Sequence, residues 1–138
     1  MPRPRPISDA DYARLLTVRS GLRRFERWSA AQAAEHGVTA SQHQLLLAVR
    51  GHHERQGPTV RQVADYLLIK HHSAVELADR TEKAGLITRA RDLEDRRAVR
   101  LRLSTAGART LEALTSAHID ELAGLTPLFE SMLGALAT

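Results

Sequence analysis

Residues 58–103 read PTVRQVADYLLIKHHSAVELADRTEKAGLITRARDLEDRRAVRLRL and carry the signals of two short helices. Thr59 and Gln62 have the spacing of a capping box, in which each side chain bonds the other residue's backbone N–H at a helix start. A second helix is predicted over 70–84, followed by Gly85, a residue suited to a left-handed helix end. Apolar or small residues recur at helical spacing, namely Val63, Ala64 and Leu67, then Ala74, Leu77, Ala78 and Thr81. Two helices joined by a short turn form a helix-turn-helix.

A two-stranded ribbon, or wing, is predicted directly after these helices. Apolar residues alternate with arginines over 99–103, the period of a half-buried strand, and residues 86–88 supply the partner strand. The connection between the strands is highly basic, and its tip carries Arg96 and Arg97. Paired arginines at a hairpin tip suit the narrow, negative minor groove of DNA, with Asp95 as a partner that fixes the arginine fork. The alternative is a solvated hairpin of mixed charge.

Several short motifs in this order resemble the multiple-antibiotic-resistance-regulator (MarR) family of winged helix-turn-helix transcription factors. They are Gln42 to Leu47, Val63-Ala64, Leu77-Ala78-Asp79-Arg80, Glu82, Gly85-Leu86-Ile87, Asp95-Arg96-Arg97-Ala98 and Leu103-Ser104-Thr105-Ala106-Gly107. The resemblance continues more weakly to both ends and covers nearly the whole chain. It implies a homodimer that binds a palindromic operator, usually as a repressor, and often releases it when a small ligand binds.

Length and composition are those of one globular domain with a basic surface. The 138 residues carry a net charge of +4 and a pI near 10.3, which favours a polyanionic partner. The absence of cysteine excludes disulfides and thiol redox chemistry. No apolar run is long enough to span a membrane, and no secretory signal is evident, so a cytoplasmic protein without a membrane partner is expected.

Two more helices are predicted before this stretch. Ser8 precedes a helix expected over 9–36, with acidic residues in its first turn. Thr39 and Gln42 form a second capping box and open the next helix. The apolar side of the first helix is assigned to Tyr12, Leu15, Leu16, Leu22, Phe25 and Trp28, and the core positions of the second to Leu45, Leu46, Leu47 and Val49.

The C-terminal region is predicted to form two helices. Ser104 or Thr105 caps the first, which runs to about Leu122, and Thr126-Pro127 has the form of a new helix start. Inward positions are assigned to Leu111, Leu114, Ile119 and Leu122, and the short terminal helix carries Leu128, Phe129, Met132, Leu133 and Leu136.

Both ends of the chain therefore carry apolar helices that one subunit has little surface to cover. Burying them against a second copy would solve this problem. The predicted fold is mainly α with a small β-hairpin wing: a winged helix-turn-helix lobe over 39–103, flanked by dimerisation helices over 8–36 and 106–137.

In a helix-turn-helix the N-terminal half of the second helix enters the major groove. Candidate DNA contacts are therefore Arg61, Lys70, His71, His72, Ser73, Val75, Glu76 and Arg80, with Arg96 or Arg97 in the minor groove. The resemblance implies a glycine where Leu68 stands in an apolar turn, and a basic residue where Glu76 stands. Glu76 can instead pair with Arg80.

The family resemblance also implies a pocket for a small-molecule effector between the dimerisation helices and the lobe. Candidate lining residues are Phe25, Trp28, His43, Leu46 and Tyr66, each with core packing as its alternative role. His118 is a further candidate for a pocket of this kind.

No cofactor is expected, and no metal site is predicted. The adjacent pairs His52-His53 and His71-His72 have no metal-ligand spacing, because neighbouring residues on a helix point in different directions. Nothing in the sequence pairs a nucleophile with a base or supplies a phosphate loop, so the chain is not expected to be an enzyme. The alternatives to a sequence-specific regulator are a non-specific architectural DNA binder and a winged helix that binds proteins.

Overall fold

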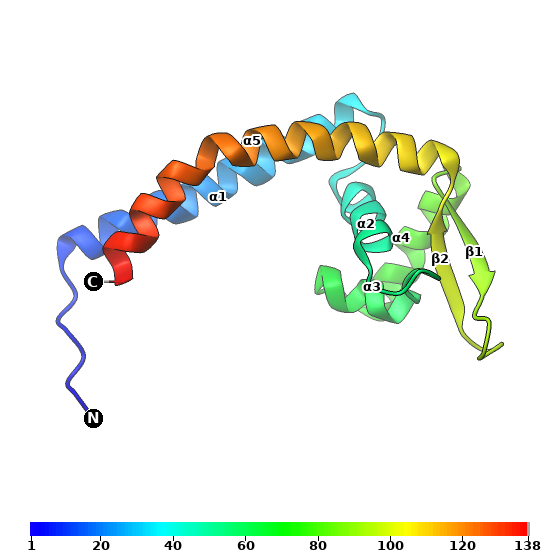
Figure 1. Cartoon of the computed structure of the whole chain (residues 1–138), viewed down its shortest axis with the longest axis horizontal. Helices are drawn as coiled ribbons and strands as arrows, with labels where there is room; N and C mark the ends of the chain where they lie inside the picture. Colours follow the sequence, from blue (N-terminus) through cyan, green and yellow to red (C-terminus); the bar gives the residue numbers. More distant parts are fainter. Residues whose placement is uncertain (138) are drawn as a thin grey trace.

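The computed structural model describes residues 1–137, with side chains described through Gly134. Its elements are α1 (Asp9–Glu35), α2 (Ala40–Gly51), α3 (Val60–Leu67), α4 (His71–Lys83), β1 (Ile87–Arg91), β2 (Val99–Leu103) and α5 (Thr105–Ala137). Figure 1 shows two parts. The lobe comprises α2, α3, α4, both strands and the start of α5; the arm is α1 with the part of α5 beside it. The predicted mainly helical fold with a hairpin wing is confirmed.

Local capping signals determine where the helices begin. The Thr39–Gln42 and Thr59–Gln62 boxes are both formed, with each side chain bonded to the other residue's backbone N–H at 2.9 to 3.2 Å. Ser8 caps α1 and also forms a box, because the Asp11 carboxylate accepts its backbone N–H at 2.8 Å. These caps satisfy backbone donors that a helix start leaves unpaired.

The core of the lobe is formed by side chains from α2, α3, α4 and the wing. Leu45, Val63, Leu77, Ile87 and Leu101 are each at most 2% exposed. The assignment of Leu47 to this core was wrong, because its side chain is 52% exposed. Three predicted core residues of α2, Leu45, Leu46 and Val49, share the inward side, and at 100° per residue Leu47 falls on the opposite side.

The wing is an antiparallel pair in which Ile87 lies opposite Leu103 and Arg91 opposite Val99. Strand β1 is therefore longer than predicted, and the connection shortens to residues 92–98. The Leu101 N–H donates to the Pro58 carbonyl at 2.8 Å, which ties the segment before α3 to the wing.

The prediction of two C-terminal helices was wrong, because α5 continues through Pro127 as one helix. Proline lacks the N–H that would bond four residues back, and its ring normally bends a helix. The Thr126 hydroxyl donates to the Leu122 carbonyl at 3.0 Å within this turn, and Figure 1 shows α5 curved over its second half. Ser104 is the cap, with its Oγ accepting the Gly107 N–H at 3.0 Å.

Much of the apolar surface of the arm is uncovered within the single chain. Tyr12, Leu16, Ile119 and Leu133 are 61 to 65% exposed. The inward assignment of Ile119 was therefore wrong for one subunit, and Leu122, at 45% exposed, does not join the core either. The side chain of Leu136 lies outside the described residues. Within residues 1–137 no helix combines the length and apolar character needed to cross a bilayer.

Candidate nucleic-acid interface

The turn between α3 and α4 is shaped by Leu68. Its backbone is left-handed, with φ 56° and ψ 43°, and its N–H donates to the Ala64 carbonyl, which ends α3. Leu68 and Ile69 are the two apolar residues of this turn, and neither side chain is buried. Leu68 is 91% exposed and Ile69 is 37% exposed. The Leu68 side chain therefore does not pack against the lobe.

Helix α4 has one buried and one exposed side, as its sequence predicts. Ala74, Leu77, Ala78 and Thr81 are at most 2% exposed, and the Thr81 hydroxyl donates to the Leu77 carbonyl. The candidate contact residues Lys70, His71, His72, Val75, Glu76 and Arg80 are all exposed, and Ser73 is half-buried. Lys70 is the N-cap and makes no side-chain cap bond, so the start of α4 offers backbone N–H groups to an external acceptor.

The alternative pairing of Glu76 with Arg80 was wrong, since these two side chains form no ion pair in the described part of the chain. The carboxylates of helix α4 that are engaged are Asp79 and Glu82, which accept from Arg89 of β1 at 2.7 and 3.5 Å. Glu76 and Arg80 thus both remain directed to solvent on the exposed side of α4.

The tip of the wing is organised by Asp92, a residue that the sequence did not single out. One carboxylate oxygen accepts the N–H groups of Glu94 and Asp95 at 2.8 Å, and the other accepts Nε of Arg100 at 2.8 Å. These backbone bonds, followed by the Arg100 bond, lower the pKa of Asp92 to about 2. Asp92 therefore stays ionised and holds the tip in one shape.

The role predicted for Asp95, fixing an arginine fork, was wrong. Its carboxylate accepts the backbone N–H of Arg97 at 3.0 Å and neither guanidinium of the pair. Within residues 1–137 the guanidinium groups of Arg96 and Arg97 form no ion pair, and both residues are exposed. The physical reason is that the tight turn at 92–98 needs acceptors for its own backbone N–H groups.

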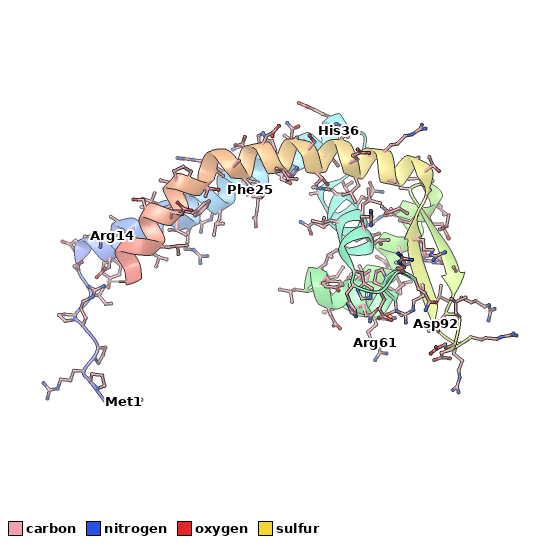
Figure 2. All side chains as sticks on the ribbon, in the orientation of Figure 1. Met1, Arg14, Phe25, His36, Arg61 and Asp92 are labelled. Carbon is pink, nitrogen blue, oxygen red and sulfur yellow. The ribbon has the colours of Figure 1, made fainter. Side chains whose placement is uncertain are left out.

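The wing and the two helices enclose a groove of about 660 Å³. It is lined by Thr59, Val60, Arg61, His71, Asp95, Arg97, Ala98 and Val99. Three predicted contact residues from separate elements, Arg61, His71 and Arg97, therefore meet at one surface, whereas Arg96 does not line the groove. Figure 2 shows Arg61 and Asp92 at the end of the lobe that points away from α5.

A separate cavity of about 730 Å³ lies between α1, α2 and α5. Of the predicted pocket residues, Phe25 and His43 line it, and Trp28 packs 4.8 Å from the ring of His118, which also lines it. The placement of Leu46 and Tyr66 in this pocket was wrong. Leu46 is fully buried in the core, and Tyr66 lines a smaller pocket of about 400 Å³ between α2 and α3.

The two histidines of the larger cavity are His118, which polar contacts hold in place, and His43, whose ring packs against it. His118 contacts the Ser29 hydroxyl at 2.6 Å and donates from Nδ1 to the Leu114 carbonyl at 2.7 Å. The ring of His43 lies 4.7 Å from that of His118. Burial first, and the nearby His118 second, lower the pKa of His43, so His43 is neutral at physiological pH.

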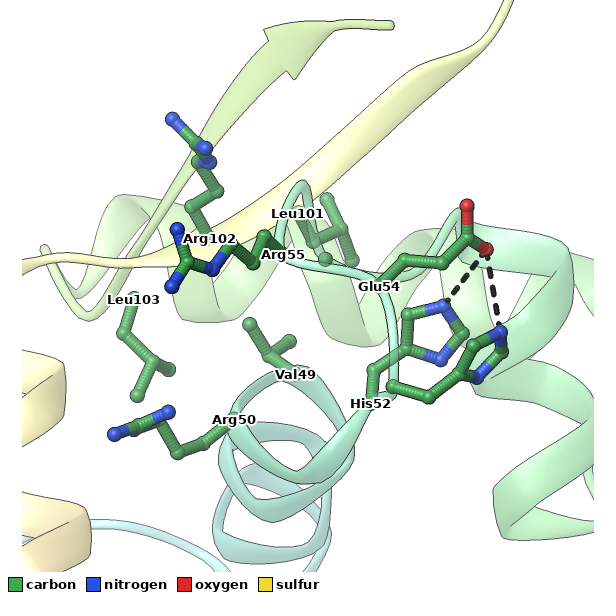
Figure 3. A pocket seen from close by; sticks show the side chains of 10 residues that line it. Val49, Arg50, His52, Glu54, Arg55, Leu101, Arg102 and Leu103 are labelled. Carbon is green, nitrogen blue, oxygen red and sulfur yellow. Dashed lines mark hydrogen bonds and ion pairs between the residues drawn. The ribbon is translucent and has the colours of Figure 1, made fainter.

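A third group of side chains surrounds the loop after α2, beside a pocket of about 440 Å³ (Figure 3). His52 Nε2 lies 3.3 Å and His53 Nε2 3.7 Å from the same Glu54 oxygen. The expectation that adjacent histidines diverge was wrong for this pair, because both residues follow the last helical residue, Gly51, and the backbone there is no longer helical.

Comparison with known proteins adds a family match over part of the chain, and a shared fold, to this geometry. Residues 36–98 match the family model described as MarR family. A MarR family protein from Bacillus stearothermophilus has the same fold with a TM-score of 0.75, 21% identity and 96% of each chain covered. A MarR family transcription regulator matches with a TM-score of 0.76 and 22% identity, and the match covers 94% of this chain and 89% of that one. MepR of Staphylococcus aureus, solved as a DNA complex, matches with a TM-score of 0.70 and 20% identity, and the match covers 96% of each chain. No curated protein matches the sequence.

The fold and its exposed helix and wing define the class of winged helix-turn-helix proteins. Within that class, residues 36–98 match the MarR family model, which the sequence motifs also resemble, and solved MarR family structures share the fold of the chain. The match of residues 36–98 agrees with the expectation that the chain is not an enzyme.

Proposed function

We propose that the chain is a homodimeric, sequence-specific DNA-binding regulator that acts as a repressor on a palindromic operator. Helix α4 would enter the major groove, with its exposed residues from Lys70 to Arg80 facing base edges and phosphates. One observation carries the proposal: Arg61, His71 and Arg97, from three separate elements, line the same groove. Such a surface can bind adjacent phosphates and a minor groove together.

Arg97 is the better candidate for the minor-groove contact, with Arg96 at its edge. Arg97 lines the groove beside α3 and α4, and its backbone is fixed by the Asp95 carboxylate. Arg96 offers its carbonyl oxygen to Arg91 at 3.2 Å, which also positions the tip. A preorganised tip loses less conformational entropy on binding than a flexible one.

The dimer would be built from residues 8–36 and 106–137, with the lobe over 39–103 presented to DNA. The support is the exposed apolar side of the arm, where Leu15, Leu16, Leu128 and Leu133 are each at least 43% exposed. Monomeric proteins rarely leave a continuous apolar surface of this kind to water. A symmetric dimer would place two α4 helices on half-sites about one helical turn apart.

A small-molecule effector would bind in the cavity between α1, α2 and α5. Its wall combines apolar side chains with Ser29, His43 and His118, a composition typical of ligand pockets. A ligand there would contact both arm and lobe, and could change operator affinity only by preferring one arrangement of the two.

The test is a fluorescence-anisotropy titration against the chain's own promoter region and a shuffled duplex, each at two salt concentrations. Preference for the promoter sequence supports a specific regulator. Equal, salt-sensitive binding of both duplexes would make the chain a non-specific architectural protein, and no binding would favour a protein-interaction module.

A further inference from the structure

We propose that His52, His53 and Glu54 form a binding site for a divalent transition-metal ion of the Zn²⁺ type. Their three candidate ligand atoms all lie within 4.8 Å of one another. In a tetrahedral zinc site with bonds of about 2.0 Å, neighbouring ligand atoms lie about 3.3 Å apart. The two histidine nitrogens are 3.3 and 3.7 Å from the Glu54 oxygen. A movement of the exposed His53 ring that brings all three separations from at most 4.8 Å to about 3.3 Å would complete this geometry.

Figure 3 shows both imidazoles directed at the Glu54 carboxylate from the same short loop. Two imidazole nitrogens and one carboxylate oxygen suit zinc and its neighbours in the first transition row. The set does not suit calcium or magnesium, which take oxygen ligands. Three protein ligands leave the fourth tetrahedral position to water.

His52 is held as a ligand by a contact outside the metal sphere. Its side chain is 1% exposed, and Nδ1 lies 2.8 Å from the hydroxyl of Tyr66 on α3. Without metal, Nε2–H donates to Glu54 and Nδ1 accepts from Tyr66. With the metal on Nε2, the ring remains neutral and carries its proton on Nδ1, which donates to the Tyr66 oxygen. Metal-bound histidines usually have such a partner.

The Glu54 carboxylate is also held by a contact outside the metal sphere. The second oxygen of Glu54 lies 3.5 Å from Arg100 of β2, and Arg100 is bound to Asp92 at 2.8 Å. The proposed ion would therefore join the loop after α2 to α3 through Tyr66, and to the tip of the wing through Arg100. Metal binding would make the lobe more resistant to unfolding, since an ion that binds only the folded state stabilises it.

The experiment uses the full chain, purified without a histidine tag and freed of metal, in a Zn²⁺ titration against a chromophoric chelator. We expect one Zn²⁺ per chain and a rise in melting temperature when Zn²⁺ is added. His53→Gln should weaken Zn²⁺ binding at least tenfold, and because His53 is exposed this change leaves the folded core intact. Tyr66→Phe should weaken it about tenfold as well.

His36→Gln is the matched control, since His36 is also exposed but lies at the end of α1. It should leave Zn²⁺ affinity unchanged, as should His118→Gln in the cavity between α1, α2 and α5. The proposal is overturned if the chain binds no Zn²⁺, if His53→Gln binds it as tightly as the parent, or if His118→Gln is the variant that loses it. The visible spectrum of the Co²⁺ form provides an independent readout and should change only in His53→Gln and Tyr66→Phe.

Discussion

The lobe and the arm use similar apolar residues but bury them differently. In the lobe, leucines such as Leu45 and Leu101 are fully buried by neighbours from the same chain. In the arm, Leu16 and Leu133 remain more than 60% exposed although their helices are well formed. A helical apolar pattern thus specifies which side of a helix needs covering, and not which molecule covers it.

The largest difference should appear when glycines in the two parts are changed to alanine. A Cβ on Gly107 in the lobe would overlap the Leu86 carbonyl, whereas one on Gly124 in the arm would meet nothing in its own chain. Gly107→Ala should cost about 3 kcal/mol of unfolding free energy or more, since the clash outweighs a gain in helix propensity of about 1 kcal/mol. Gly124→Ala should be neutral or stabilising by up to about 1 kcal/mol.

Urea denaturation followed by circular dichroism measures both changes. Equal losses in the two variants would contradict the comparison, because they would mean that the arm is packed as closely as the lobe. A loss in Gly124→Ala that depends on protein concentration would instead place Gly124 in a subunit interface.

The next largest effect concerns the exposed side of the arm. Leu16→Glu should weaken the proposed dimer at least a hundredfold. Burying the glutamate carboxylate against apolar side chains of the partner costs about 3 kcal/mol or more. Leu93→Glu is the matched control, since Leu93 is 85% exposed at the tip of the wing. Light scattering at micromolar concentration should show monomer for Leu16→Glu and dimer for Leu93→Glu; a parent chain that is already monomeric would refute the assignment.

A smaller effect is expected from the wing of the lobe. Arg97→Ala should reduce the slope of binding affinity against salt concentration by roughly one phosphate equivalent and weaken binding to all sequences. Arg23→Ala, an exposed arginine on α1, should leave the slope unchanged. An unaltered slope when both Arg96 and Arg97 are removed would mean that the wing does not contact DNA.

The smallest effect lies in the turn of the helix-turn-helix. Leu68 has a left-handed backbone and an exposed side chain, so Leu68→Gly removes strain without losing packing. We expect unfolding free energy to rise by about 1 kcal/mol or stay constant, since the greater flexibility of glycine in the unfolded chain offsets part of the gain. A clear loss in thermal denaturation would show that the Leu68 side chain has a covering partner.

Predictions from the sequence were right where a signal acts over a few residues. The capping boxes at Thr39 and Thr59 and the buried side of α4 each depend on spacings of three or four residues. The prediction at Pro127 was wrong because packing between distant segments, and not the local sequence, decides the structure there. Its local preference favours a helix start, but α5 continues beside α1, and packing along a long helix outweighs the cost of one missing hydrogen bond.

The sequence by itself determined the winged helix-turn-helix, the exposed basic residues of α4 and the wing, and the family that they resemble. Only the tertiary structure decided that Asp92 holds the wing tip, that Arg97 shares a groove with Arg61, and that His52 and His53 meet at Glu54 between Tyr66 and Arg100. Those arrangements join residues up to 46 positions apart, as Glu54 and Arg100 are. Side-chain spacing along the chain carries no record of such contacts, because they form only when separate elements pack against one core.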